Sequence, residues 1–251
     1  MIFNIPHSSI CIPEKERLNI FLSDEDLKSE INQMTDRYTD ELFSVHASPE
    51  DSVVKFPVSR LVVDPERFED DSIETMSRVG MGVIYTKTSH GKPLRDIPTD
   101  EERRILLNRY YYPHHNTITN AIEIELSKNG YSIIIDCHSF PSRSLPFNVD
   151  QNPNRPDICI GTDDYHTPGK IIEEIVEVGN DLGYRCSINK PYSGTFVPLP
   201  FYKQNKNVIS VMIEINRSLY MDENTGVKSL HFLERQKNIG LLIEQIRKFR
   251  P

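Results

Sequence analysis

The sequence predicts an α/β protein built around a parallel sheet. Short runs of β-branched residues, such as 133–135 and 208–213, alternate along the chain with segments that carry helix start and stop signals. Continuous apolar runs of this kind are typical of strands buried on both faces. With 251 residues, of which 37% are hydrophobic and 26% charged, the chain can bury a sizeable core, and we expect one domain over residues 1–251 rather than two.

Local signals place the elements in order. Ser23 is followed by three acidic residues, which favour the positive end of a helix dipole, and Thr99 with Glu102 has the spacing of a capping box. Gly130 is a typical helix stop. In chain order we expect strands or extended segments at 3–5, within 53–63, at 82–85, 133–136, 157–161, before 189 and at 208–213, and helices from 23 with a restart at 35–36, from 99 toward 110, from 113 to 130, from 167 to 183 and from 230 to 249.

Three of the predicted strands end in residues that can carry metal chemistry. His7, His138 and Glu214 each follow an apolar run, and ligands of open α/β sheets gather outside the carboxyl ends of the strands. Two imidazoles and a carboxylate are the parts of a hydrolytic zinc site. Each residue also has a structural reading, because a lone histidine at a strand end is often a satisfied polar group and Glu214 could form an ion pair with Arg217.

Neighbouring residues strengthen the functional reading. Asp136 lies two positions before His138, so in an extended strand both side chains share a face and the carboxylate can orient the imidazole. The proline-rich loop from 140 to 156 leaves the same strand end and carries Arg143. Tyr192 follows another strand and can donate a hydrogen bond into the site, although such a tyrosine often only packs.

Arg60 and Arg67 flank a short apolar run. The guanidinium group of arginine can bind a carboxylate through two parallel hydrogen bonds, so both residues are candidate functional residues. A solvated surface arginine is the competing reading. It suits Arg67 better, because several acidic residues follow Arg67 in sequence, whereas Arg60 has few acidic neighbours.

Composition excludes several classes of partner. The formal charge of -8 and the pI near 5.5 disfavour nucleic acid and anionic membrane surfaces, which require a basic face. We find no apolar run of membrane-spanning length and no signal peptide, so we expect a cytoplasmic protein. The four cysteines are far apart and predict neither a disulfide framework nor a structural zinc knot. The oligomeric state stays open.

Several motifs, taken together, resemble one known family. They run in order through most of the chain: Pro6-His7-Ser8, Thr35-Asp36, Ser59-Arg60, Asp64 to Arg67, Tyr112-Pro113-His114-His115, Asp136-Cys137-His138-Ser139, Asn189 with Pro191-Tyr192 and Gly194, and Glu214 to Met221. The chain resembles the N-formylglutamate amidohydrolases. The resemblance implies a three-layer α/β/α fold of the phosphorylase/hydrolase type, similar to zinc carboxypeptidases and aspartoacylases, with a mixed, mostly parallel sheet and one catalytic zinc ion. It also implies hydrolysis of an amide bond beside a substrate carboxylate.

The resemblance implies roles for individual residues. His7 and His138 match the motif histidines and would be two metal ligands. The third would be Asp36, with Glu14 as the alternative. Glu214 occupies the place of the general base.

The substrate-binding side is implied in the same way. Asp64-Pro65-Glu66-Arg67 resembles a carboxylate-binding element in which asparagine is usual at the place of Glu66. Such a departure would alter carboxylate recognition, because it adds a negative charge beside Arg67. Arg67, His115, Arg143 and Tyr192 are the candidate substrate-binding residues.

We therefore expect zinc-dependent hydrolysis of an N-acyl amino acid, with N-formyl-L-glutamate giving formate and L-glutamate. A metal-activated water would attack the acyl carbon, with Glu214 as general base and Arg60 beside the oxyanion. Two alternatives remain: the substrate is a different small anionic N-acyl amino acid or a small peptide, or the protein is a non-catalytic homologue that binds a small acid.

Overall fold

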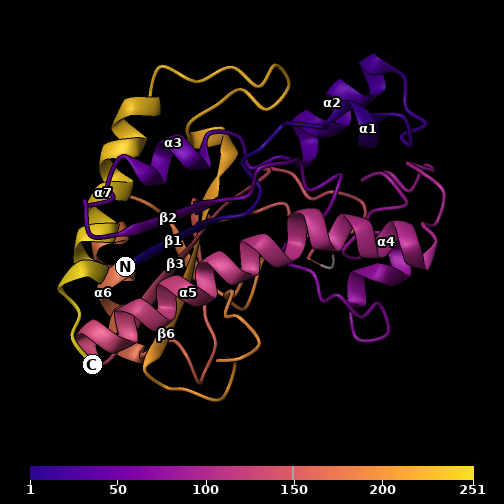
Figure 1. The fold of residues 1–251 in the computed structure, drawn as a ribbon. Coiled ribbons are helices and arrows are strands. Elements are labelled where there is room, and N and C mark those ends of the chain that lie inside the picture. The colour runs from indigo at the N-terminus through magenta and orange to yellow at the C-terminus, as the bar shows by residue number, and fades with distance from the viewer. Residues whose placement is uncertain (149) are drawn as a thin grey trace.

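The computed structural model describes residues 1–148 and 150–251 and has the predicted α/β class (Figure 1). The strands are β1 (Ile2–Ile5), β2 (Ser52–Lys55), β3 (Ser132–Phe140), β4 (Ile158–Gly161), β5 (Cys186–Ile188) and β6 (Val208–Asn216). They form one sheet in the order β2-β1-β3-β6-β4-β5. The first four of this order are parallel, whereas β4 runs antiparallel to β6 and parallel to β5. This confirms the mixed, mostly parallel sheet.

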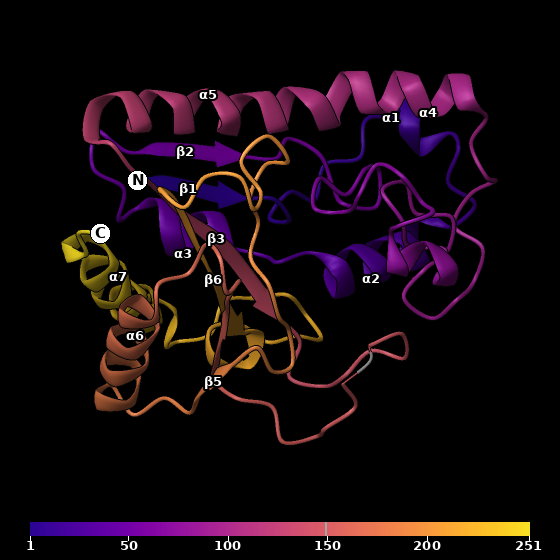
Figure 2. The same cartoon turned by 90° about the horizontal axis from the view of Figure 1, so that it is seen from below.

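Helices cover both faces of the sheet (Figure 2). The helix α5 (Tyr112–Asn129) packs on β1, β2 and β3, and the opposite face carries α3 (Thr39–Ser44), α6 (Gly169–Asp181) and α7 (Phe232–Lys248). The remaining α-helices are α1 (Glu14–Arg17), α2 (Asp24–Met34) and α4 (Asp100–Leu106), and the short helical turns are Thr75–Val79, Leu107–Tyr111 and Arg217–Leu219. Among the described residues, none of the helices has the length and apolar character to cross a bilayer.

The central strands alternate between two apolar cores. Ile133 and Ile135 pack with α3, α6 and α7, whereas Ile134 packs with α5. Successive side chains of a strand point to opposite faces of the sheet, so Asp136 and His138 lie on the same face as Ile134. The polar end of β3 therefore opens on the α5 face of the sheet, at the carboxyl ends of the parallel strands.

The predicted helix starts are largely confirmed, and two predictions were wrong. The side chains of Ser23 and Thr99 accept hydrogen bonds from the N–H groups of Asp26 and Glu102, and Thr99 forms a complete capping box. The helix does not restart at 35–36, which instead join α2 to α3. Of the extended segments predicted within 53–63, β2 covers the start, but the chain at 56–64 and 82–85 is not a strand. The N–H of Phe56 still donates to the β1 carbonyl of Ile5, whereas that of Ser59 donates to the loop carbonyl of Cys11.

Candidate metal centre and active site

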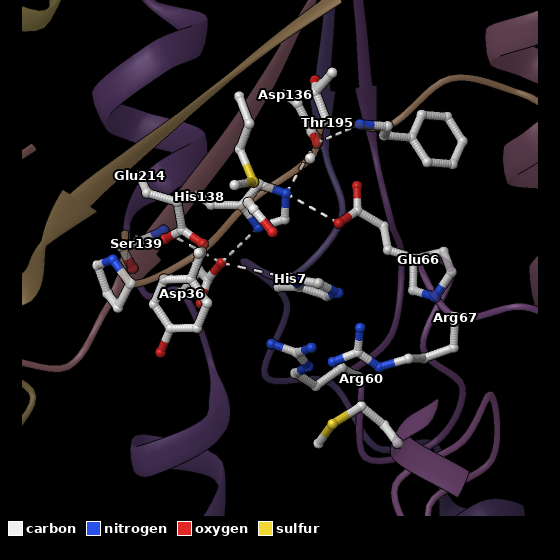
Figure 3. Close-up of a pocket in the computed structure, with 18 of the residues that line it drawn as sticks. His7, Asp36, Arg60, Glu66, Arg67, Asp136, His138, Ser139, Thr195 and Glu214 are labelled. Carbon is white, nitrogen blue, oxygen red and sulfur yellow. Dashed lines mark hydrogen bonds and ion pairs between the residues drawn. The ribbon is translucent and has the colours of Figure 1, made fainter. Parts of the chain in front are cut away.

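The three predicted strand ends meet at one edge of the sheet. The order places β1, β3 and β6 side by side, and His138 on β3 pairs in register with Glu214 on β6. His7 follows β1 by two residues. Figure 3 shows the side chains of His7, His138 and Glu214 turned toward Asp36. The parallel arrangement thus brings residues from distant parts of the chain into one cluster.

A possible metal-ligand set lies at the centre of this cluster. His7, Asp36 and His138 are buried, and one potential ligand atom from each lies within 4.8 Å of the others. Asp36 Oδ2 is 3.1 Å from His138 Nδ1 and 3.7 Å from His7 Nδ1. Two atoms bound about 2.1 Å from one tetrahedral ion would lie roughly 3.4 Å apart, so the donor set fits a single zinc ion.

An unsatisfied atom supports this fit. His7 Nδ1 is buried and has no hydrogen-bond partner within the described residues. A buried polar atom without a partner is costly, and a cation would remove that cost. The backbone N–H of Asp36 donates to the carbonyl oxygen of His7 at 3.0 Å, which fixes the connection between α2 and α3 beside the strand end.

Carboxylates lie behind both imidazoles. His7 Nε2 is 2.8 Å from Asp64 Oδ1, and His138 Nε2 is 3.0 Å from Asp136 Oδ1. Metal-binding histidines characteristically donate their second N–H to a carboxylate or a carbonyl, which fixes the tautomer and the ring orientation. Asp136 therefore lies where the sequence predicted an orienting carboxylate, on the same face of β3 as His138.

The ion pair expected as an alternative for Glu214 is instead made by Asp36. Arg217 Nη2 donates to Asp36 Oδ1 at 2.8 Å. Burial raises the pKa of Asp36, but the hydrogen bond with His138 and the nearby charges of Arg217 and His7 hold it well below its usual value. Asp36 is thus an ionised carboxylate, as a metal ligand must be.

Glu214 has the environment of a general base. Its Oε2 atom is buried and makes no hydrogen bond to any described residue. Burial raises the pKa of Glu214 to about 7, and the neighbouring charge of Asp36 acts in the same direction, while His138 and Arg217 oppose it. A carboxyl group that titrates near neutral pH can both accept and return a proton.

Asp64 organises the opposite wall of the site. Its Oδ2 atom accepts hydrogen bonds from Arg60 Nη2 at 2.7 Å and from the Tyr85 hydroxyl at 2.6 Å. Arg67 Nε lies 3.8 Å from the same oxygen and has no hydrogen-bond partner in the part of the chain that the structure describes. Figure 3 shows both guanidinium groups near His7. Arg67 therefore retains donors for a ligand.

Glu66 contacts the imidazole of His138 rather than Arg67. Its Oε2 atom is 3.0 Å from His138 Nε2, and its Oε1 atom accepts a hydrogen bond from Asn4 Nδ2 at 2.7 Å. Glu66, Asp136 and His138 form a second group of potential ligand atoms behind the first. The carboxyl group of Glu66 is therefore directed toward the imidazole of His138.

The other predicted residues lie in different places. A cavity of about 820 Å³ is lined by His115 and Tyr192 as well as by Arg60, Arg67 and Glu214. His115 Nε2 donates to the carbonyl oxygen of Pro65 at 2.8 Å, and its ring stacks on Tyr111. Arg143 is exposed on its loop and does not line the cavity, and Glu14 is exposed on α1, away from the ligand cluster.

Sequence reasoning missed Arg155, Tyr85 and the central role of Asp64. Asp64 follows the apolar residues 61–63, so the same strand-end pattern that selected His138 could have found it, although no strand forms there. No local signal marks Tyr85 or Arg155, because both reach the cavity through irregular segments.

Known proteins share both the sequence pattern and the fold. A curated N-formylglutamate deformylase of Pseudomonas putida is 23% identical over 228 residues, which is 89% of this chain and 82% of that protein. A crystal structure of an N-formylglutamate amidohydrolase from Ralstonia eutropha JMP134 matches 98% of this chain and 91% of that one, with a TM-score of 0.85 and 23% identity. A structure from Agrobacterium tumefaciens matches 99% of this chain and 91% of that one, with a TM-score of 0.68 and 18% identity.

The family model described as N-formylglutamate amidohydrolase matches residues 1–221. This range contains β1 to β6 and every residue placed above in the ligand cluster and the cavity. The chain belongs to the N-formylglutamate amidohydrolase family.

Proposed function

We propose that this protein is a zinc-dependent amidohydrolase that converts N-formyl-L-glutamate to formate and L-glutamate. The observation that carries the proposal is the juxtaposition of His7, Asp36 and His138 with the buried carboxyl of Glu214 in a cavity that also exposes Arg67. Family membership and the Pseudomonas putida deformylase support the reaction. We also propose that residues 1–251 act as one catalytic domain.

His7, Asp36 and His138 would hold the ion. When bound, a zinc ion polarises an amide carbonyl and makes a water molecule more acidic. Asp64 and Asp136 hold the Nε2 atoms of the two imidazoles, so that both Nδ1 atoms face Asp36.

Glu214 moves the proton. With a pKa raised by burial to about 7, its carboxylate accepts a proton from the attacking water and passes it to the nitrogen of the departing glutamate. Its unpartnered Oε2 atom is available for this transfer.

The two arginines of the Asp64 wall divide the substrate contacts. Arg60, fixed by Asp64, donates to the oxyanion that develops on the former carbonyl oxygen, a contribution of about 3–4 kcal/mol for a well-placed donor. Arg67 binds a carboxylate of the amino acid and so fixes the position of the scissile bond. His115 supports this wall by holding the carbonyl of Pro65, and Tyr192 lines the other side.

The test combines metal content with formate release. The purified protein is stripped with a chelator and reloaded with zinc, and formate is measured with N-formyl-L-glutamate as substrate. We expect about one zinc ion per chain, activity only in the reloaded protein, and loss of bound zinc in His138→Ala. His231→Ala is the matched control, because His231 is exposed at the start of α7. Full formate release by the stripped protein would refute the proposal.

A different N-acyl amino acid is the second candidate substrate. It is favoured by Glu66, which stands where the carboxylate-binding motif of the family usually has asparagine. A panel of N-acyl amino acids compared with N-formyl-L-glutamate under the same conditions separates the two. The non-catalytic alternative requires that no member of the panel is hydrolysed by the zinc-loaded protein.

A further inference from the structure

Arg155 is a buried cation on the far wall of the cavity. It precedes β4 directly in the loop that leaves β3, only 4% of its surface is exposed, and it lines the same cavity as Glu214. Its guanidinium group lies 5.6 Å from the ring centroid of Tyr192 and 5.8 Å from that of Phe140. The aromatic rings thus hold the charge in place.

All hydrogen-bond partners of this guanidinium are neutral. Arg155 donates to the hydroxyl groups of Tyr192 at 3.2 Å and Ser144 at 3.0 Å, and to the carbonyl oxygen of Asp150 at 3.2 Å. Its Nε atom is buried and has no hydrogen-bond partner among the described residues. Within residues 1–148 and 150–251, Arg155 forms no ion pair with a carboxylate, in contrast to Arg185 of the neighbouring segment, which pairs with Asp157.

A buried guanidinium without a counter-charge is costly unless a ligand supplies the charge. Arginine does not lose its proton in proteins, so the charge cannot be removed by titration. Buried ions are almost always paired, because desolvation of an isolated charge is strongly unfavourable. An open position beside Arg155 in a solvent-connected cavity is therefore suited to an anion.

This position is separate from the Asp64 wall. Arg60 and Arg67 lie near His7 (Figure 3). One carboxylate, that of Asp64, contacts both guanidinium groups and the imidazole. Arg155 instead contacts Tyr192, whose pKa is raised by burial and then by the nearby charge of Glu214. The cavity thus has an excess of positive charge in two places.

We propose that Arg155, together with Tyr192, forms a second carboxylate-binding subsite, which selects the N-acyl amino acids that carry a second carboxylate. Arg67 binds one carboxylate and Arg155 binds the other. The inference rests on the proposed amidohydrolase function and adds the residue that selects for the second charge. The second carboxylate belongs either to the amino-acid side chain or to the acyl group.

Two pairs of substrates distinguish these sources. N-formyl-L-glutamate and N-formyl-L-glutamine differ only in the charge of the side chain, and N-succinyl-L-alanine and N-butyryl-L-alanine differ in the charge of the acyl group. For the zinc-loaded protein, we expect kcat/KM to favour the charged member of one pair by about 100-fold, since an unpaired buried cation penalises the neutral analogue. The preferred pair identifies the source.

Arg155→Gln should reduce this preference to within about threefold. Circular dichroism and zinc content, compared with the wild type, report whether the variant is folded. Arg155→Lys should recover part of the preference, because it retains the charge but not the planar fork. Arg104→Gln is the charge-matched control, since Arg104 is exposed on α4 and pairs with Glu101. An undiminished preference in Arg155→Gln, or no preference in either pair, would overturn the proposal.

Binding of glutarate separates this inference from the proposed function. Calorimetry on the zinc-loaded wild type and on Arg155→Gln measures the subsite without turnover, and we expect the variant to bind glutarate at least about tenfold more weakly. If no N-acyl amino acid is hydrolysed but glutarate binding still depends on Arg155, the proposed reaction fails and the subsite stands. If hydrolysis occurs and Arg155→Gln binds glutarate as tightly as the wild type, the subsite fails.

Discussion

Asp64 is fully buried and connects the ligand cluster to the arginine wall. It accepts hydrogen bonds from His7, Arg60 and Tyr85, and its Oδ1 atom also accepts one from the backbone N–H of Glu66. Burial raises its pKa, but the charges of Arg60, His7 and Arg67 hold the pKa well below the usual value. One ionised side chain therefore fixes both the proposed metal ligand His7 and the proposed oxyanion donor Arg60.

Replacing Asp64 with asparagine should weaken zinc binding without leaving a hole where the side chain was. The amide retains the size of the side chain but loses the charge, so His7 is no longer held in the required tautomer. We expect zinc affinity to fall by about 10- to 100-fold, measured by competition with a chromogenic chelator. The control is Asp96→Asn, because Asp96 is exposed. Equal zinc affinities in both variants would contradict the role of Asp64.

The pKa of Glu214 predicts a pH-dependent stability of the metal-free protein. The folded value is raised by burial from 4.5 to about 7, so folding favours the protonated form. The stabilisation is complete below the unfolded pKa and is lost as the pH rises through about 7. Glu214→Gln removes the titration, and the variant should gain up to about 3 kcal/mol relative to the wild type between about pH 5 and pH 8. Urea unfolding of chelator-treated proteins at both ends of this range provides the measurement, and a difference that is independent of pH would exclude the raised pKa.

At the scale of single elements, the capping box of α4 is a local device remote from the chemistry. Thr99 Oγ1 accepts from the N–H of Glu102, and Glu102 Oε2 accepts from the N–H of Thr99. The turn Leu107–Tyr111 continues α4 into α5, so the cap stabilises the start of a long helical segment that reaches the sheet.

Thr99→Ala should lower the free energy of unfolding by about 1 kcal/mol. The Thr99 hydroxyl accepts from the N–H of Glu102 and donates to Glu102 Oε2, and both of these hydrogen bonds are lost. The catalytic rate should be unchanged, since Thr99 does not line the cavity. Thr99→Ser preserves the hydroxyl group and should retain most of the stability in the same denaturation experiment. Equal losses in the serine and alanine variants would show that the methyl group, not the cap, matters.

The elements also show why part of the site could be predicted and part could not. His138 and Glu214 were identifiable because each continues an apolar strand, and the parallel pairing of β3 with β6 then fixes them as neighbours. The choice between Asp36 and Glu14 depended on how the chain folds after β1, which no local pattern encodes. Arg143 and Arg155 occupy the same loop, and only the tertiary structure distinguishes the exposed arginine from the buried one.

For the whole molecule, the predicted α/β class and the mixed sheet are confirmed, since alternating apolar runs and helix caps are local signals. The family resemblance implies a mixed sheet, but no residue of β4 indicates that this strand runs antiparallel to β6. The excursion from Lys55 to Asp100 was harder to predict, because its packing depends on contacts such as that of Asp64 N–H with the carbonyl of Val83 rather than on regular ladders.

Metal removal should destabilise the whole protein, because the ligands come from three segments that are far apart in the chain. Zinc that binds only the folded state stabilises it by mass action, about 2.7 kcal/mol at a hundredfold excess over the dissociation constant. We expect a corresponding fall in the thermal midpoint on chelation and no zinc response in His7→Ala combined with His138→Ala. A zinc-induced shift that persists in the double variant would place the ion elsewhere.

The antiparallel direction of β4 has a consequence for how this fold can diversify. Because β4 starts at the edge where β3 ends, the loop of residues 141–157 leaves and re-enters the sheet at the rim of the cavity and needs no crossover helix. Its length and composition can therefore change without shifting the register of the strands beneath it. Changes in this loop could therefore alter which ligand the cavity binds, while His138 and Glu214 keep their positions at the strand ends.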